Sequence, residues 1–148
     1  MTENERIIRK LYDVAERQDG EGFAAIFAED GYLLDVPAGQ KYVGKEIAGM
    51  IGQFAGAFPD IHRELGKFID GGDTIVVELS LNGTHTGPLV LPFGTILPTG
   101  KTIEVPCADV FVIKDGKVAS FHCYNAASVL LAQIGVLGNL SAALVPNA

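Results

Sequence analysis

The stretch ADVFVIKDGKVASF, residues 108–121, decides the fold of this chain. It predicts two strands joined by a tight turn at Lys114-Asp115-Gly116, because the runs on both sides are rich in strand-forming residues. Working outward, the two strands extend over residues 101–113 and 117–125. Asp109 interrupts the first strand, which is otherwise apolar. Because an ionised carboxylate is costly to bury, we expect Asp109 to have partners or to stay protonated.

Both helices and strands are predicted on the N-terminal side of this hairpin. A second hairpin is expected around Gly71-Gly72-Asp73. Periodicity and stop signals indicate helices at residues 3–17, 21–27 and 44–58, a turn at 29–31, and strands at 32–36, 61–70 and 74–86. Residues 87–100 form a loop rich in proline and glycine. A helix at about 126–134 is followed by an apolar tail, 135–148, which packs on the same domain or on a neighbouring subunit.

Helices followed by a run of antiparallel strands are typical of the α+β class. No repeat or linker divides residues 1–148, so we expect a single domain. The predicted architecture is a conical barrel, in which a strongly curved, mostly antiparallel sheet wraps around the N-terminal helices. Such a sheet would leave an apolar pocket between itself and the helices.

Composition restricts the partners of the protein. The net charge is −7, and the longest run of basic residues is the pair Arg9-Lys10, which argues against nucleic acid and anionic membranes. No apolar stretch reaches the roughly 18 residues of a membrane span. The N-terminus is polar and acidic, so we expect a cytoplasmic protein. Hydrophobic residues make up 48% of the chain, which favours an apolar pocket, a subunit interface or both, and we expect a homodimer.

Several kinds of site are not supported by the sequence. Cys107 and Cys123 are expected to be buried, reduced thiols, because there is no CxxC motif. The histidines at 62, 85 and 122 lack a second ligand at a recognisable spacing, so no metal site is predicted. The glycines of the 87–100 region do not form a phosphate-binding motif, and no GxSxG motif is present.

Two further residues join Asp109 as candidate catalytic groups. Asp35 ends the strand Tyr32-Leu33-Leu34 and precedes a proline loop, while Tyr12 lies on the apolar stripe of the first helix. A base beside a neutral acid can move protons next to a carbonyl group. Each residue also has a plain structural interpretation, with Tyr12 as a core tyrosine and both aspartates bracing the backbone around them.

The quoted stretch, together with FAAIFAEDGYLLDVPAG (residues 23–39), GTHTGPL (83–89), LPTGK (97–101) and LLAQIG (130–135), resembles the nuclear transport factor 2-like superfamily. The second half is most similar to SnoaL-like polyketide cyclases, and the resemblance spans about residues 5–135. It implies the conical α+β fold. It leaves the function open, because this fold carries isomerases, cyclases, hydrolases, dehydratases and binding proteins.

Two templates within this superfamily imply different chemistry. Similarity to ketosteroid isomerases, an established example of pKa tuning, makes Asp35 the general base and makes Tyr12 and a protonated Asp109 the donors to an enolate oxygen. SnoaL-like cyclases instead carry an acid/base aspartate a fixed distance before the Gln-Leu-Gly motif. Counting back from Gln133-Ile134-Gly135 places Ala126 at that position, beside Asn125.

Strand alternation predicts the remaining pocket residues. If Asp109 points inward, Phe121, Cys123 and Asn125 are expected to point inward too, whereas His122 faces an interface or solvent. His85 lies at the pocket rim or only hydrogen-bonds the loop, and the apolar loop side chains cover the pocket or pack against another subunit. The predicted substrate-binding residues are Phe54, Phe93, Phe111, Phe121, Cys123 and Asn125.

The sequence therefore predicts a cofactor-independent acid/base enzyme that acts on a hydrophobic, ketone-bearing small molecule, as an isomerase or a polyketide-type cyclase. A proton shuttle and an oxyanion site suffice for this reaction, so no cofactor is expected. The alternatives are a non-catalytic binding or accessory domain and a hydrolase or dehydratase that uses the same pocket carboxyls.

Overall fold

The computed structural model describes all 148 residues, and its main feature is a six-stranded sheet with the order β2-β1-β8-β7-β4-β3. The strands are β1 (Phe27–Asp35), β2 (Gln40–Val43), β3 (His62–Asp70), β4 (Thr74–Thr84), β7 (Thr102–Lys114) and β8 (Lys117–Asn125). Only the pairing of β1 with β8 is parallel. The α+β class with a mostly antiparallel sheet is confirmed.

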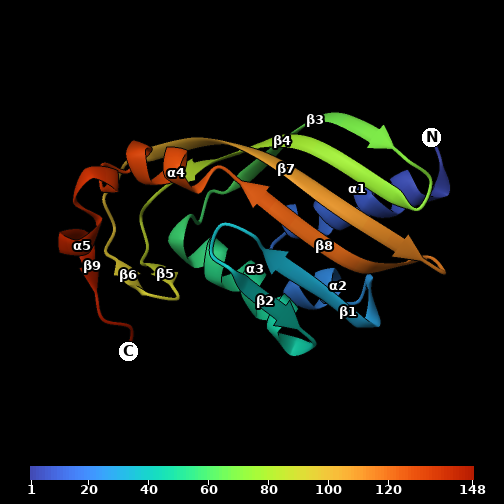
Figure 1. The fold of residues 1–148 in the computed structure, drawn as a ribbon, viewed down its shortest axis with the longest axis horizontal. Helices are drawn as coiled ribbons and strands as arrows, with labels where there is room; N and C mark the ends of the chain where they lie inside the picture. The colour runs from blue at the N-terminus through green and yellow to red at the C-terminus, as the bar shows by residue number, and fades with distance from the viewer.

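The sheet is strongly curved but remains open. Register shifts occur within β3, between β1 and β8, and between β7 and β8, and such irregularities bend strands. Figure 1 shows the long strands arching over the N-terminal helices. Strands β2 and β3 are the free edges, so the sheet is an open cone around the helices rather than a closed barrel.

The helices on the concave side are α1 (Glu3–Glu16), α2 (Gly20–Ala24) and α3 (Lys45–Ala57). The Thr2 hydroxyl caps α1 by accepting the backbone N–H of Glu5 at 3.2 Å. Ile8, Leu11, Tyr12 and Ala15 recur at helical spacing and are all buried. This periodicity turns Tyr12 toward the sheet. None of the helices combines the length and apolar character that a membrane crossing requires.

Strand β7 supplies the inner face of the sheet through regular alternation. Its buried side chains are Ile103, Val105, Cys107, Asp109, Phe111 and Ile113. Asp109 therefore takes an inward position that hydrophobic residues occupy elsewhere on the strand. On β8, Cys123 pairs with Asp109 and Phe121 pairs with Phe111, so these side chains share the inner face.

The expected turn at residues 29–31 is wrong. These residues lie inside β1, where the register against β8 shifts between Phe27 and Tyr32. Gly31 fits this irregular stretch because a Cβ there would lie 2.7 Å from the carbonyl oxygen of Val118. The acidic, glycine-containing sequence thus marks a bulge in a long strand instead of a turn before a short one.

Residues 87–100, predicted as a loop, contain two strands of a small second sheet. Strands β5 (Leu89–Leu91) and β6 (Gly94–Ile96) pair with each other, and β6 also pairs with β9 (Leu144–Val145) from the C-terminal tail. The chain reaches β9 through α4 (Ala127–Gln133), the 3-10 turn η1 (Leu137–Asn139) and α5 (Leu140–Ala143). The tail therefore packs on its own domain, at the end of the molecule where Figure 1 places β5, β6 and β9 together.

Candidate functional site

A cavity of about 270 Å³ lies between the inner face of the large sheet, helices α1 and α3, and the small sheet. Twenty-seven residues line it, and 21 of them are hydrophobic. The volume is close to the lower end of the range of ligand sites, and the lining suits an apolar small molecule. Leu89, Leu91 and Phe93 belong to this lining, so the 87–100 segment covers one side of the cavity.

Tyr12 and Asp109 form the most enclosed polar pair of the cavity. The Tyr12 hydroxyl donates to Oδ2 of Asp109 at 2.6 Å, and the two residues are 2% and 3% exposed. Burial raises the pKa of Asp109 to about 6, although hydrogen bonds from Tyr12 and from the neighbouring thiols oppose the change. Burial and the Asp109 charge raise the pKa of Tyr12, so the phenol stays protonated and donates. Asp109 thus changes protonation close to neutral pH.

Asp35 brings a second carboxyl to the same cavity. It is the last residue of β1 and is only partly buried. The Asn125 side-chain amide donates to its Oδ1 at 3.3 Å. Burial raises the pKa of Asp35, while hydrogen bonds from the Ala38 backbone and from Asn125 work in the opposite direction. The cavity therefore holds two carboxyls in different environments, with Asp109 the more enclosed.

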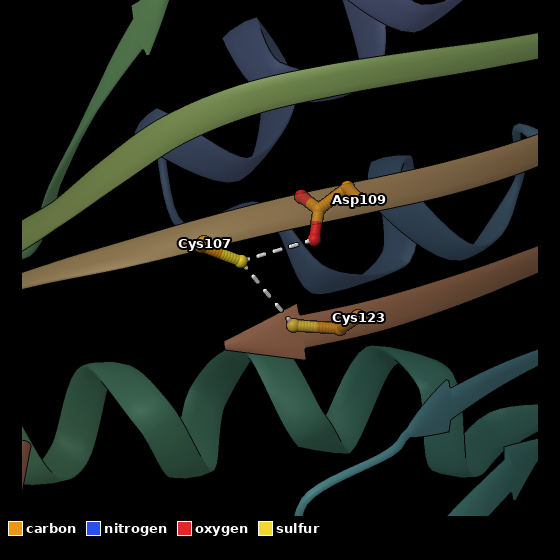
Figure 2. A group of neighbouring side chains, drawn as sticks. All are labelled: Cys107, Asp109 and Cys123. Carbon is orange, nitrogen blue, oxygen red and sulfur yellow. Dashed lines mark hydrogen bonds between the residues drawn. The ribbon is translucent and has the colours of Figure 1, made fainter. Parts of the chain in front are cut away.

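Two thiols and an amide connect the carboxyls. Cys107 donates to Oδ1 of Asp109 at 3.3 Å, and its sulfur lies 3.7 Å from the sulfur of Cys123. Asn125 completes the connection, because its amide nitrogen lies 3.5 Å from the Cys123 sulfur and also bonds Asp35. Figure 2 shows the two thiols and Asp109 on the neighbouring strands β7 and β8. A continuous line of polar contacts thus runs from Asp35 to Tyr12 across an otherwise apolar wall.

Both cysteines are free thiols; Cys107 is buried, as predicted, whereas Cys123 is only partly buried. The hydrogen bond with Cys123, burial, and the Asp109 charge all raise the pKa of Cys107. Cys107 is therefore protonated, and acts as a donor to the buried carboxylate instead of as a nucleophile.

Five of the six predicted substrate-binding residues line the cavity, namely Phe54, Phe93, Phe121, Cys123 and Asn125. Phe111 does not. It is fully buried behind the lining. Its ring is edge-on to Tyr12, with centroids 5.9 Å apart, and its centroid lies 4.3 Å from that of Phe121. Phe111 is the next inward-facing residue of β7 after Asp109. It lies beneath the cavity wall, where it supports the Tyr12 and Phe121 rings.

The two histidines with open roles lie outside the cavity lining. His122 is on the outer face of the sheet, as alternation predicted, and its Nε2 lies 2.9 Å from the Tyr32 hydroxyl. His85 is fully buried, and its Nδ1 accepts the Thr99 backbone N–H at 3.2 Å. His85 therefore hydrogen-bonds the loop, which is one of the two predicted alternatives.

Sequence reasoning missed three polar lining residues, Arg63, Tyr42 and Gln53. Arg63 forms an ion pair with Glu16 at 3.4 Å, so part of its charge is compensated away from the carboxyls. Its position two residues before the half-buried Leu65 on β3 is a strand-alternation signal that indicates the inner face. Burial and the charges of Asp35 and Glu46 raise the pKa of Tyr42.

Ala126, for which the sequence resemblance predicts the cyclase aspartate position, is the N-cap of α4. Its backbone N–H donates to the Pro106 carbonyl at 2.9 Å, and its methyl group packs on the core. Asn125 on one side and Ala127 on the other line the cavity. Residues 125–127 therefore offer an amide but no carboxyl group of their own.

Comparisons with known proteins agree with this architecture. Solved structures with the same fold include a protein described as a SnoaL-like polyketide cyclase from Jannaschia sp. CCS1, with TM-score 0.77, 19% identity, and coverage of 89% of this chain and 91% of that one. A protein with a ketosteroid isomerase-like fold from Catenulispora acidiphila, in complex with trimethylamine, has TM-score 0.73, 21% identity and coverage of 87% and 92%. IdmH from Streptomyces antibioticus, described as a polyketide cyclase, has TM-score 0.71, 23% identity and coverage of 89% and 98%.

At these identities the likeness establishes the fold alone. No curated protein matches the sequence. The family model of the SnoaL-like domain, however, matches residues 8–121, which include Tyr12, Asp35 and Asp109. The chain belongs to the SnoaL-like domain family.

Proposed function

We propose that this protein is a cofactor-independent acid/base enzyme that enolises a hydrophobic, ketone-bearing small molecule, as an isomerase or a polyketide-type cyclase. One observation carries the proposal: two carboxyls in different environments, Asp35 and Asp109, line the same apolar cavity. Pairs of titratable groups whose surroundings separate their protonation behaviour are suited to divide the roles of acid and base.

Asp35 is the general base in this proposal. Burial raises its pKa, which makes it a stronger base, while its hydrogen bonds from Ala38 and Asn125 favour the ionised form. An ionised carboxylate at the cavity wall can accept the proton α to a ketone. The apolar lining around it excludes water, which strengthens the electrostatic interactions of the charge that develops on the substrate.

Asp109 and Tyr12 stabilise the enolate oxygen in this proposal. In the free protein, Tyr12 donates to Asp109, whose pKa is about 6. A ligand that fills the cavity removes further solvent and favours the neutral acid. Protonated Asp109 then donates a hydrogen bond to the substrate oxygen, and the Tyr12 hydroxyl is released to donate to the same oxygen. Two donors aimed at one oxygen stabilise the charge that forms when Asp35 removes the proton.

A non-catalytic small-molecule-binding domain is the second candidate. Two points favour it: the resemblance to SnoaL-like cyclases implies Ala126 at the position of their aspartate, and the Tyr12 hydroxyl bonds Asp109 instead of standing free toward the cavity. In this case the polar line across the wall braces β7 against α1 and orients a ligand without turnover.

The test is a titration with a hydrophobic phenol of the equilenin type, whose phenolate mimics an enolate, combined with α-proton exchange of unsaturated ketones in deuterium oxide. We compare the wild type with Asp35→Asn, Asp109→Asn and the matched control Asp13→Asn, whose side chain is exposed on α1. Removal of the Asp35 charge is expected to tighten phenolate binding and to abolish exchange. Asp109→Asn is expected to weaken binding about tenfold, because an amide is a weaker donor than a carboxylic acid.

Equal phenol affinity in all four proteins would contradict the enolate site. Ligand binding without exchange in the wild type, across the ketones tried, would support the binding domain instead.

A further inference from the structure

We propose that Cys107, Cys123 and Asp109 form a binding site for a thiophilic divalent cation such as Zn²⁺ or Cd²⁺. The three donor groups come from the neighbouring strands β7 and β8, and their ligand atoms all lie within 4.8 Å of one another. Figure 2 shows the two sulfurs directed toward each other and one Asp109 oxygen directed toward Cys107. This inference goes beyond the enolisation chemistry, since it concerns an ion rather than an organic substrate, although both proposals use Asp109.

The distances between the donor atoms fit tetrahedral coordination. With Zn–S bonds of about 2.3 Å, two sulfurs of a tetrahedron are separated by about 3.8 Å, and a sulfur and a carboxylate oxygen by about 3.6 Å. The structure has 3.7 Å between the two sulfurs and 3.3 Å between the Cys107 sulfur and Oδ1 of Asp109. The third pair of donor atoms, on Cys123 and Asp109, also lies within 4.8 Å, so side-chain rotation can bring the three donors around one ion.

The groups around the three donors hold them in this arrangement. Oδ1 of Asp109 faces Cys107, while Oδ2 accepts the Tyr12 hydroxyl at 2.6 Å. The carboxylate can therefore bind an ion through one oxygen while its other oxygen stays hydrogen-bonded, a common arrangement for carboxylate ligands. The Asn125 amide lies 3.5 Å from the Cys123 sulfur and adds a polar neighbour to the second thiol.

The electrostatics of the site favour a cation. Two thiolates and a carboxylate carry three negative charges, and no lysine or arginine donates a hydrogen bond to any of them. The charge of Arg63 acts on Asp109, but Arg63 is paired with Glu16. Cysteine binds a metal ion as the thiolate, so an ion that binds here competes with protons for the two sulfurs. Affinity is therefore expected to rise with pH. Two sulfur donors select soft or borderline ions over Mg²⁺ and Ca²⁺, which prefer oxygen.

The fourth coordination position opens into the cavity. All three donor residues line the cavity, and the remaining wall near them is largely apolar. A site with three protein ligands and one free position is typical of zinc centres that bind water or a substrate atom. The ligand class for this position is a small molecule with an oxygen, nitrogen or sulfur donor that fits the cavity of about 270 Å³.

The test is a titration of reduced, metal-free protein with Cd²⁺ and with Co²⁺ at mildly alkaline pH. Thiolate-to-Cd²⁺ charge transfer in the ultraviolet and the visible bands of tetrahedral Co²⁺ report the ligands directly. We expect one ion per chain, and a loss of affinity of at least about tenfold in Cys107→Ser and Cys123→Ser. Asp109→Asn keeps both thiols, so charge transfer is retained while affinity falls about 10- to 100-fold.

The matched control is His62→Gln, because His62 lies between Glu16 and Glu64 on the surface and could bind ions by itself. Its affinity is expected to equal that of the wild type. If a serine variant fails to fold, the wild type still decides the question through thiol alkylation, which bound Cd²⁺ should slow at both cysteines. The absence of charge transfer and of thiol protection in folded wild type at saturating Cd²⁺, or signals that depend on His62, would overturn the proposal.

Discussion

The unfolding free energy of Asp109→Asn, relative to that of the wild type, should increase as the pH rises from about 4 to about 7. Asp109 is 3% exposed, and burial raises its pKa from the ordinary value of 3.8 to about 6. A difference of about two pH units corresponds to about 3 kcal/mol. Because the folded state holds this proton more tightly than the unfolded chain, the carboxyl favours folding below pH 3.8, and this contribution is lost as the pH rises through about 6.

The magnitude follows from the linkage between proton binding and folding. Between about pH 4 and about pH 7, the wild type is expected to lose about 2 kcal/mol relative to the asparagine variant. Asparagine has no charge to desolvate, and it keeps an oxygen that can accept the Tyr12 hydroxyl. Any difference in hydrogen-bond quality adds a constant that does not vary with pH.

The assay is urea-induced unfolding of both proteins at several pH values, with the difference in unfolding free energy plotted against pH. Taking the difference removes the contribution of the other titrating groups. A difference that does not change between about pH 4 and about pH 7 would refute the raised pKa, and a change of opposite sign would show that partners dominate over burial.

Tyr12→Phe tests, in the same experiment, how the Tyr12 hydrogen bond affects the pKa of Asp109. The Tyr12 hydrogen bond lowers the pKa of Asp109, so its removal should move the transition above pH 6. Loss of a hydrogen bond to a charged group should also cost about 1.5–3 kcal/mol near neutral pH. An unchanged midpoint in Tyr12→Phe would contradict the contact.

Two further predictions concern the cover of the cavity. Burial lowers the pKa of His85 below 6.5. The wild type should therefore lose stability relative to His85→Gln as the pH falls through 6.5, as measured by urea unfolding. Plots of unfolding free energy against pH that run parallel for the two proteins would contradict this. Gly87→Ala should destabilise the protein by about 1–3 kcal/mol, because a Cβ there would overlap the Gly56 carbonyl oxygen. In the control Gly49→Ala on α3, the added Cβ has no atom within 4 Å, so the unfolding free energy should rise by about 0.5–1 kcal/mol. Equal effects of the two changes would refute the close approach at Gly87.

Local sequence patterns predicted the parts of the fold that depend on neighbouring residues. The alternation along β7 placed Asp109 on the inner face, and the helical stripe of α1 placed Tyr12 opposite it. Regular alternation transfers reliably from sequence to structure because each side chain's face follows from its neighbours. The same alternation correctly predicted that the Phe121 side chain points inward and the His122 side chain outward.

The missed features depend on contacts between distant residues. The bulge in β1 and the pairing of β6 with β9 join segments that the sequence alone does not relate. The contact between the two thiols has the same origin. Cys107 pairs with Asn125, and Asp109 pairs with Cys123, so the thiols meet diagonally across the hairpin only in this register. A shift of one residue would turn Cys123 to the outer face of the sheet.

The two proposals make opposite demands on Asp109. Enolate stabilisation needs its protonated form, whereas a metal ion needs the carboxylate together with both thiolates. Because the pKa of Asp109 is about 6, mildly acidic conditions favour the first state. The hydrogen bond with Cys123 and burial raise the pKa of Cys107, so this thiol stays protonated unless an ion displaces its proton. A bound cation should therefore suppress proton exchange at the ketone, and acidification should release the ion and restore exchange. Exchange that persists in the presence of a bound ion would mean that Asp109 is not the donor to the enolate oxygen.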